Sequence, residues 1–312
     1  DEGSFAEGPL LLGMRRLSII DVAGGHQPIT GEDGNVVVVC NGEIYNFQAL
    51  RTELESRGHR FATRSDTEVV VHGYEEWGDA ILGRLEGMFG LAIWDRRRRR
   101  LLVARDPLGI KPLYYYQDAT RFAFASEAKA LLRVPGIEAR IDAAALAQYL
   151  SIGYVCAPNA LFAGMRKLPP GHRLVVEEGR VDIRAYWSLK PEIDGNRTEK
   201  AWIDELRSEM ERAVREQMVS DVPIGAFLSG GIDSSAVVAF MSRHTDQPVR
   251  TYSIGFAGSS GAALYNELPH ARAVAQAFGT THREILVQPD VAALLPQLLW
   301  HMDEPVADAA FI

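Results

Sequence analysis

The chain has 312 residues, of which 47% are hydrophobic, and a formal net charge of −8 at pH 7; this length predicts two domains with buried cores and excludes an intrinsically disordered chain. The negative charge argues against a nucleic-acid-binding surface, and no apolar run approaches the roughly 18 residues that span a bilayer. Only two cysteines are present, which excludes a disulfide framework and favours a reducing, cytoplasmic compartment.

The first 190 residues are predicted to be rich in β-structure with a few helices. Ser65 and Glu68 have the spacing of a capping box at the start of a helix. The polar, turn-rich stretch 191–197 predicts a linker. Hydrophobic patterning predicts strands at 36–40, 88–95, 101–105, 122–126 and 173–177, and helices at 48–57 and 66–76.

The remaining residues alternate between helical and strand patterns. Thr198 is predicted to cap an amphipathic helix whose apolar residues recur at helical spacing from Trp202 to Met218. Strands at 222–228 and 249–256 alternate with helices that reach 243 and span 269–278. This alternation predicts an α/β doubly wound parallel sheet, which binds ligands at the carboxyl ends of its strands.

One loop between a predicted strand and helix carries the strongest chemical signal. It reads Ser-Gly-Gly-Ile-Asp-Ser-Ser over 229–235, so glycines and hydroxyls stand beside the free N–H groups of a helix N-terminus. Such a place suits phosphate oxygens. Asp233 would repel phosphate alone, but it fits if Mg²⁺ bridges carboxylate and phosphate. The alternative is a plain glycine turn before a serine-capped helix.

This loop resembles the pyrophosphate-binding loop of the N-type ATP pyrophosphatases, and specifically that of glutamine-hydrolysing asparagine synthetases. Segments that resemble the glutaminase half of the same family precede it in the family's order: 15–21, 27–28, 41–46, 65–68, 87–89, 105–114 and 126–131. The resemblance implies an α+β Ntn-type αββα sandwich over 1–190, the linker at 191–197, and part of an α/β adenine nucleotide alpha hydrolase-like domain over 198–312. It also implies that the family's first and last segments lie outside this sequence.

In the glutaminase half, the resemblance implies a glutamine site. The Asn41 side chain and the Gly42 N–H would form an oxyanion hole, although Asn-Gly is also a common hairpin turn. Arg16, unless it is a plain surface arginine, would pair with the substrate carboxylate, and Glu43 and Asp66 would hold its ammonium group. Asp66 could equally favour a first helical turn. The other glutamine-binding positions implied are Leu17, Ser18, Ile19 and Ile20.

The nucleophile of this family is a cysteine at the first position of the mature chain, and this sequence begins with Asp1. Cys40 ends an apolar run and is expected to be a small core residue, and Cys156 is expected to be structural. The five arginines at 96–100 predict a solvated hairpin end in preference to a nucleic-acid or lipid patch. Within the segment 105–114, Arg105, Asp106 and Lys111 are expected to have a positioning role.

In the synthetase half, ATP would be cleaved between its α- and β-phosphates. Leu228 and Ile254 would contact adenosine, or else pack as ordinary strand residues. Relatives carry Asp where this chain has Asn266, which removes one metal or ammonium partner. Asp303, Glu304 and Asp308 resemble the start of the substrate-side region. The pyrophosphate would be held by Ser229, Gly230, Gly231, Asp233, Ser234 and Ser235, with Mg²⁺ on Asp233.

The expected function is therefore a glutamine-dependent amide ligase that forms AMP and pyrophosphate, with aspartate as the expected acceptor. The expected partners are glutamine, ATP and aspartate, with neither nucleic acid nor membrane, and a homodimer is left open. Two alternatives remain: a carboxylate-adenylating ligase without glutaminase activity, as in β-lactam synthetase relatives, and a non-catalytic module that binds glutamine or nucleotide. The presence of Arg16, Asn41, Gly42, Glu43 and Asp66 together argues against loss of the glutaminase.

Overall fold

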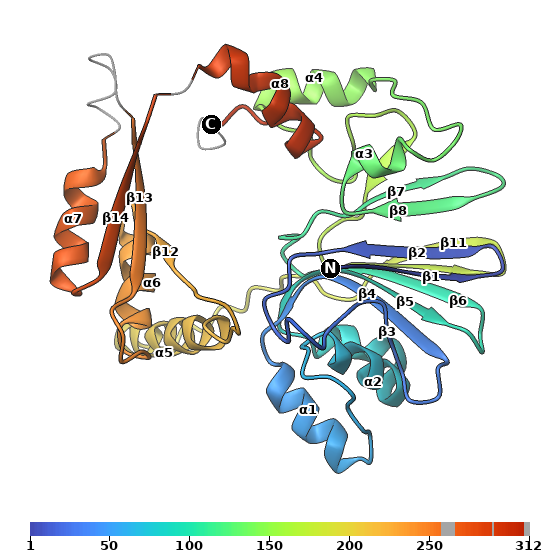
Figure 1. The fold of residues 1–312 in the computed structure, drawn as a ribbon, viewed down its shortest axis with the longest axis horizontal. Helices are drawn as coiled ribbons and strands as arrows, with labels where there is room; N and C mark the ends of the chain where they lie inside the picture. Colours follow the sequence, from blue (N-terminus) through green and yellow to red (C-terminus); the bar gives the residue numbers. More distant parts are fainter. Residues whose placement is uncertain (257–265, 289, 309–312) are drawn as a thin grey trace. The chain divides into compact units, whose positions relative to one another are not determined.

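The computed structural model describes residues 1–256, 266–288 and 290–308 (Figure 1). The contacts divide the chain into two compact units. Unit 1 comprises Asp1–Lys190 together with Ala293–Ile312, and unit 2 comprises Pro191–Ala292. Residues 293–308, which the sequence pattern placed with the synthetase half, therefore pack with unit 1.

Unit 1 is built around an antiparallel six-stranded sheet. Helices α1 (Phe47–Ser56) and α2 (Glu68–Trp77) lie on one face of it, and the hairpin of β1 (Glu2–Glu7) and β2 (Leu10–Arg15) lies on the other (Figure 1). The α+β class expected for this part is confirmed. The strand order is β11 (Arg180–Ala185), β10 (His172–Glu177), β6 (Arg100–Arg105), β5 (Gly87–Asp95), β4 (Val36–Ile44) and β3 (Ile29–Thr30).

Strand β4 is central to this unit because both of its faces are covered. Val37 and Val39 share one core cluster with Leu12 of the hairpin, and Val38 is also fully buried. The continuous apolar run predicted such a strand, but its predicted end at 40 is wrong. The strand continues to Ile44, where it still pairs with β5, because Gly42 lets the neighbouring backbone approach. A Cβ on Gly42 would lie 2.0 Å from the Met88 carbonyl oxygen.

The capping box expected at the start of α2 does not form. The helix begins at Glu68 after Thr67, whose side chain makes no cap. The Glu68 carboxylate instead accepts hydrogen bonds from the N–H groups of Ala62 and Thr63, at 2.7 and 2.8 Å. Glu68 thus fixes the loop that leads into the helix, which is why its spacing from Ser65 has no capping function.

Unit 1 also contains a second sheet and several further helices. A second, three-stranded sheet has the order β8 (Phe122–Ala125), β7 (Tyr114–Gln117) and β9 (Met165–Lys167). The short helices are η1 (Gly78–Gly83), α3 (Ala128–Leu131) and α4 (Ala143–Ile152), and α8 (Val291–Met302) reaches into this unit from the chain's end.

The arginine run at the β5–β6 turn is held by carboxylates. Arg96 pairs with Glu7 at 2.8 Å and Arg97 with Asp33 at 2.7 Å. Arg100 is buried and binds Asp79 through two hydrogen bonds of 2.7 Å. Four of the five side chains are mostly exposed, as expected for a hairpin end, but Arg100 is a core residue and its assignment to the solvated run is wrong. Since the sequence shows no partner, a buried pair of this kind could not be foreseen.

Unit 2 contains a parallel sheet with the order β12 (Ala226–Phe227), β13 (Arg250–Phe256) and β14 (Thr281–Val287). Helices α5 (Glu199–Gln217), α6 (Ile232–Met241) and α7 (Leu268–Ala277) accompany it. The parallel sheet is confirmed, and so is the cap of α5, where Thr198 accepts a hydrogen bond from the Ala201 N–H. The described strands follow chain order and therefore wind in one direction.

The first strand of unit 2 is shorter than the predicted 222–228. It spans only two residues, because Pro223 has no N–H for a ladder and the chain joins β13 only from Ala226 onward. The loop 229–235 follows at its carboxyl end, where parallel sheets place their ligands.

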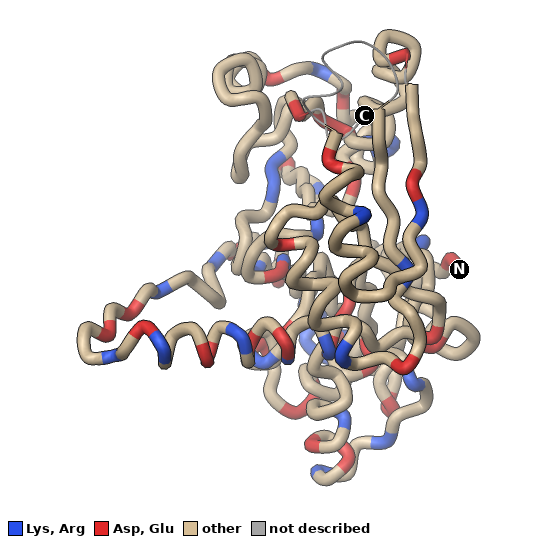
Figure 2. Tube along the Cα trace, turned by 90° about the vertical axis from the view of Figure 1, so that its left-hand side faces the viewer, with Lys and Arg blue, Asp and Glu red and all other residues tan. Residues whose placement is uncertain are grey.

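Acidic and basic residues are interspersed along the described part of the trace (Figure 2). Among the described residues, no helix combines the length and the apolar character needed to cross a membrane.

Candidate functional site

A cavity of about 750 Å³ in unit 1 collects the residues implied for glutamine binding. Its walls come from β2, the segment after it, β4, the residue Asp66 before α2, β5 and the end of β8. Ser18 alone of the nine lies outside this lining and donates a hydrogen bond to Asp1. The eight that line the cavity are Arg16, Leu17, Ile19, Ile20, Asn41, Gly42, Glu43 and Asp66.

The edge of β4 explains how the cavity presents backbone donors. The side-chain amide of Gln27 accepts a hydrogen bond from the Cys40 N–H at 2.6 Å and donates one to the Cys40 carbonyl at 3.1 Å. Four residues further on, the Ile44 N–H donates to Asp66 at 2.8 Å. Because alternate residues of a strand point their N–H groups to the same edge, the Gly42 N–H faces this edge between the two bonds.

Asn41 lies on the same strand, and its Nδ2 donates to the Ser126 hydroxyl at 3.0 Å. That contact uses one of the two Nδ2 hydrogens and leaves the second for another acceptor. The alternative of a hairpin turn at Asn41-Gly42 is wrong, because both residues remain in the β4–β5 ladder opposite Gly90 and Phe89.

Two carboxyl groups near the edge have unusual acid–base properties. Asp66 is 3% exposed, and burial raises its pKa although Ile44 and Thr67 donate backbone hydrogen bonds to it. Burial, and then the charge of Asp66, raise the pKa of Glu43, while Lys111 opposes that rise. Two close carboxylates in a half-buried place would be relieved by a cation. Asp66 precedes α2 and serves the β4 edge, so the alternative of a first-turn residue is wrong.

Arg16 is anchored and not a free surface side chain. Its guanidinium donates to the Gly25 carbonyl and its Nε lies 3.2 Å from an Asp1 carboxylate oxygen, with 11% of the side chain exposed. A planar guanidinium on the cavity wall can bind a carboxylate with two parallel hydrogen bonds.

The lining residues that were not predicted as site residues include Lys111, Ser126 and Glu127. Lys111 is placed by its neighbours: the buried Asp106 accepts hydrogen bonds from the N–H groups of Ile110 and Lys111 at 2.9 and 3.0 Å, and Arg105 donates to the Lys111 carbonyl at 2.7 Å. Arg105, Asp106 and Lys111 were expected to have a positioning role, but the sequence did not show what they position. Ser126 was placed inside the predicted strand 122–126, whereas β8 ends at Ala125; the signal for Ser126 was the segment 126–131, which resembles the glutaminase half.

The two cysteines match their expected structural roles in burial. Cys40 is 1% exposed, and burial raises the pKa of its thiol far above the ordinary range, so a thiolate is disfavoured. It touches the cavity wall but its thiol is protonated at neutral pH. Cys156 is half-buried and its N–H donates to the Gln148 side chain at 3.0 Å.

In unit 2, the loop 229–235 is ordered by its own hydroxyls. The Ser229 and Ser234 hydroxyl oxygens lie 2.9 Å apart, and the Gly231 N–H donates to Ser229 at 3.1 Å. Gly230 has φ +85°, and a Cβ there would come within 2.5 Å of His270 in α7. At Gly231 the nearest contact of such a Cβ is the Ser229 hydroxyl at 3.2 Å, so the space in front of the helix start is otherwise open.

These features fit a polyphosphate. Helix α6 begins after Gly231 without a side-chain cap, and the Ser235 hydroxyl is buried with no hydrogen-bond partner among the described residues. Asp233 lies exposed in the first turn of α6, where it can meet a cation bound to phosphate. A cavity of about 310 Å³ lies beside the loop, lined by Ser229, Ser234, Leu228 and Ile254 among others.

The two adenosine candidates differ. Leu228 is 1% exposed and its side chain belongs to the core cluster with Val238 and Ala271. Ile254 is 51% exposed and lines the same cavity. Asn266, where relatives have Asp, accepts a hydrogen bond from the Leu268 N–H and so helps to start α7.

The acidic residues near the chain's end make structural contacts in unit 1. Asp303 accepts hydrogen bonds from the N–H groups of Ala128 and Lys129, and Glu304 accepts one from Leu161 at 2.7 Å. Asp308 is exposed. Asp303 and Glu304 thus bind the glutaminase part of the chain, which their resemblance to a substrate-side segment did not suggest.

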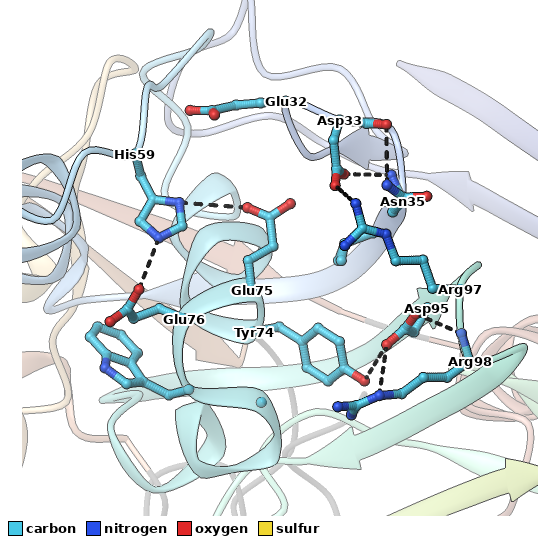
Figure 3. A pocket seen from close by; sticks show the side chains of 13 residues that line it. Glu32, Asp33, Asn35, His59, Tyr74, Glu75, Glu76, Asp95, Arg97 and Arg98 are labelled. Atoms are coloured by element: carbon cyan, nitrogen blue, oxygen red, sulfur yellow. Dashed lines mark hydrogen bonds and ion pairs between the residues drawn. The ribbon is translucent and has the colours of Figure 1, made fainter.

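A second cavity, of about 650 Å³, lies over α2 on the opposite side of the sheet from the hairpin (Figure 3). Its charged groups are paired: His59 lies between Glu75 and Glu76, and Arg97 meets Asp33. Glu32, His59 and His72 offer ligand atoms within 4.8 Å of one another. Buried His72 also lies 3.0 Å from Glu75 and 3.6 Å from Glu68, so carboxylates already balance its charge.

Comparison with known protein families shows which family the chain belongs to. Residues 1–187 match the model of the glutamine amidotransferase domain. The chain belongs to this family. Residues 205–312 match the asparagine synthase model. The chain is thus a member of the glutamine amidotransferase family that also carries an asparagine synthase region, as the resemblance predicted.

Curated relatives agree with this assignment. The chain is 35% identical to asparagine synthetase [glutamine-hydrolyzing] 3 of Bacillus subtilis, over 98% of this chain and 52% of that protein. It is 38% identical to asparagine synthetase [glutamine-hydrolyzing] 1 of the same organism, over 100% of this chain and 48% of the relative. A putative asparagine synthetase of Mycobacterium tuberculosis is 39% identical over 98% and 48%. The chain therefore spans about half the length of the curated relatives it matches.

Among solved structures, the chain resembles the glutamine phosphoribosylpyrophosphate amidotransferase of Bacillus subtilis with a TM-score of 0.39 and 18% identity, over 87% of this chain and 52% of that one. An allosteric regulatory enzyme of purine biosynthesis gives a TM-score of 0.43 and 16% identity, over 90% and 67%. We draw no functional conclusion from likeness at this level.

Proposed function

We propose that the protein containing this chain is a glutamine-dependent asparagine synthetase, which transfers ammonia from glutamine to aspartate with cleavage of ATP to AMP and pyrophosphate. The observation that carries the proposal is the convergence of Arg16, Asn41, Gly42, Glu43 and Asp66 on one cavity, in a chain that also presents an uncapped glycine-serine loop at a helix start. The family matches and the curated relatives support the same assignment.

In the glutaminase step, Arg16 would bind the α-carboxylate of glutamine, and Glu43 and Asp66 would bind its α-ammonium group. The raised pKa values of these two carboxyls reflect a place that favours a positive ligand. The side-chain amide would then lie at the edge of β4. There the Gly42 N–H and the Asn41 side chain would stabilise the oxyanion. One such donor lowers the activation barrier by about 3 kcal/mol.

In the synthetase step, the loop 229–235 would receive the pyrophosphate that leaves when a substrate carboxylate attacks the α-phosphorus of ATP. The N–H groups in the first turn of α6 and the Ser235 hydroxyl would stabilise its oxygens. Asp233 would hold Mg²⁺, which when bound offsets negative charge on the phosphates. Ile254 would contact the nucleoside, whereas Leu228 would support the loop from the core.

The test uses the full-length protein with glutamine, ATP and aspartate, and measures glutamate, asparagine, AMP and pyrophosphate. We expect all four to form in equal amounts, and asparagine still to form when ammonia replaces glutamine. AMP without glutamine hydrolysis would instead support the adenylating ligase that lacks a glutaminase. Binding of glutamine or nucleotide without turnover would support the non-catalytic module. Arg16→Ala serves as the internal control, because it should impair synthesis from glutamine but not from ammonia.

A further inference from the structure

Asp303 completes a helix in the wall of the glutamine cavity, although it comes from the far end of the chain. Its two carboxylate oxygens accept hydrogen bonds from the N–H groups of Ala128 at 2.9 Å and Lys129 at 3.2 Å, which are 175 and 174 residues away in sequence. Helix α3 begins at Ala128, and Glu127 before it provides no side-chain cap. Asp303 therefore supplies the cap of α3 from outside the helix.

The capped helix start is connected to the oxyanion-hole candidates. Ser126 and Glu127, immediately before the capped residues, line the same cavity as Asn41 and Gly42. The Ser126 hydroxyl accepts the hydrogen bond from Asn41 Nδ2 at 3.0 Å. A continuous path thus runs from the Asp303 carboxylate through the start of α3 and Ser126 to the Asn41 amide.

Asp303 is itself held firmly. Its side chain is 5% exposed, and Lys129 Nζ lies 2.9 Å from one of its oxygens. The next residue, Glu304, accepts a hydrogen bond from the Leu161 N–H at 2.7 Å and pairs with Lys167, and the Ala307 N–H donates to the Gly153 carbonyl at 2.8 Å. The chain turns sharply here, with a φ of 64° at Asp303, a conformation that Asp, Asn and Gly tolerate best.

The contact of Asp303 joins two regions of the chain that match different family models. Asp303 lies within the region that matches the asparagine synthase model, whereas Asn41 and Ser126 lie within the glutamine amidotransferase match. It directly follows helix α8, which begins at Val291 among the last residues of unit 2. A change in the synthetase region that moves α8 would move the cap of α3.

We propose that Asp303 is a positioning residue for glutamine hydrolysis, through which the synthetase region orients the Asn41 amide. This inference rests on the proposed function. With the cap in place, Ser126 holds the amide for the oxyanion, and without it the start of α3 loosens and the amide loses its orientation. Because oxyanion stabilisation acts in the transition state, loss of Asp303 lowers kcat for glutamine hydrolysis and leaves KM nearly unchanged.

The experiment compares Asp303→Gly and Asp303→Asn in the full-length protein. Glycine keeps the left-handed turn but removes the cap, and asparagine keeps the turn and one acceptor oxygen. We expect kcat for glutamine hydrolysis to fall roughly ten-fold in Asp303→Gly, within the range usual for coupling between sites, and to fall less in Asp303→Asn. Lys129→Met is the matched control: it removes the ion pair but keeps both backbone hydrogen bonds, so kcat should change less than two-fold, on the order of a surface ion pair.

Two further measurements separate positioning from general damage. Amide hydrogen exchange over residues 122–132 should rise in Asp303→Gly and stay unchanged in Lys129→Met. In the Ser126→Ala background, Asp303→Gly should cause no further loss of kcat, because Ser126 carries the effect to Asn41. Synthesis from ammonia checks that the synthetase region is intact.

The outcomes are distinct. Wild-type protein that releases no glutamate from glutamine overturns the proposed function itself. If wild-type protein is active and kcat is unchanged in Asp303→Gly, or if the loss adds fully to that of Ser126→Ala, the role of Asp303 is refuted. Should Asp303→Gly fail to fold, Asp303→Asn decides: raised exchange at 122–132 with an unchanged kcat refutes the role, and raised exchange with a lower kcat supports it.

Discussion

The cavity of unit 1 is held by hydrogen bonds between residues far apart in sequence, whereas the loop of unit 2 is held by hydrogen bonds between near neighbours. Asn41 is oriented by Ser126, 85 residues away in sequence, and Asp66 reaches β4 across 22 residues. Within the loop 229–235, the side-chain hydrogen bonds join residues at most five apart. A site of the first kind depends on many supports outside it, whereas a site of the second kind depends on its own few residues. Single substitutions should therefore act differently in the two places.

The largest effect is expected in the loop, where we assign a single residue, Asp233, to the bound Mg²⁺ of the proposed reaction. Asp233→Asn should lower ATP-dependent AMP formation about 1,000-fold, or about 4 kcal/mol, because the charge that binds Mg²⁺ is lost. Glutamine hydrolysis without ATP should be unaffected. Quantifying AMP and glutamate in the same reaction checks both statements. The matched control is Asp246→Asn in the exposed turn after α6, which should leave AMP formation unchanged; equal loss in both variants would contradict the role of Asp233.

In the cavity, Asn41→Ala should lower kcat for glutamine hydrolysis about 100-fold, or about 3 kcal/mol, since one oxyanion donor is removed. The KM for glutamine should change much less, and synthesis from ammonia should persist. Steady-state assays of glutamate release provide the measurement. Ser18→Ala is the control, because Ser18 was implied by resemblance but lies outside the cavity lining. A large loss in Ser18→Ala would show that the structure places this segment differently from the active enzyme.

The dependence of unit 1 on buried supports also predicts a pH effect. Burial alone would lower the pKa of His72, but Glu68 and Glu75 outweigh it and raise the value to about 9. The folded-state value thus exceeds the ordinary 6.5, so the stabilisation is full below pH 6.5 and is lost as pH rises to 9. The loss should amount to about 3 kcal/mol.

Urea denaturation of the chain at pH 6.5 and pH 9 measures this loss as a change in the unfolding of unit 1. His72→Gln should flatten the dependence, because a neutral amide does not titrate. Unit 2 should show no comparable trend, which would sharpen the contrast between the units. If the free energy of unfolding changed with pH as much in His72→Gln as in the wild type, the pH dependence would belong to other groups.

The smallest expected effect is the difference in stability between alanine substitutions at two adjacent glycines. Gly230→Ala should destabilise unit 2 by about 2 kcal/mol, since its φ is +85° and a Cβ would meet His270 at 2.5 Å. Gly231→Ala should change stability by less than about 0.5 kcal/mol, because its backbone is extended and its surroundings are open, yet it should weaken ATP binding by filling that space. Denaturation curves and nucleotide titrations of both variants distinguish the effects; similar stabilities would contradict the close approach of α7.

The same difference in sequence separation explains what the sequence could predict. The loop's strand–turn–helix setting, the Thr198 cap and the parallel sheet follow from local patterns, and the structure has them. The capping box prediction failed because Glu68 finds partners in the preceding loop that local spacing does not reveal, and the hairpin alternative at Asn41 is excluded by a long strand pairing.

Site residues follow the same rule. Motifs named Arg16, Asn41, Glu43 and Asp66, and the structure brings them together, but no pattern showed that Lys111 and Ser126 would join them. Lys111 reaches the cavity only because Asp106 collects the backbone amides of its loop. Such placement depends on the whole tertiary structure, so spacing along the chain cannot supply it.

The carboxamide of Gln27 bridges the N–H and the carbonyl of Cys40 on the open side of β4, and Gly42 presents the next amide along that side. The Gln27 side chain thus binds the backbone at Cys40, and we assign the side-chain amide of the substrate to the next N–H on the same edge of β4, at Gly42. A free glutamine entering the cavity would repeat, two residues further along, a recognition that the fold already performs internally. Gln27 thus makes, within the fold, the kind of backbone contact that we propose for the side-chain amide of the substrate.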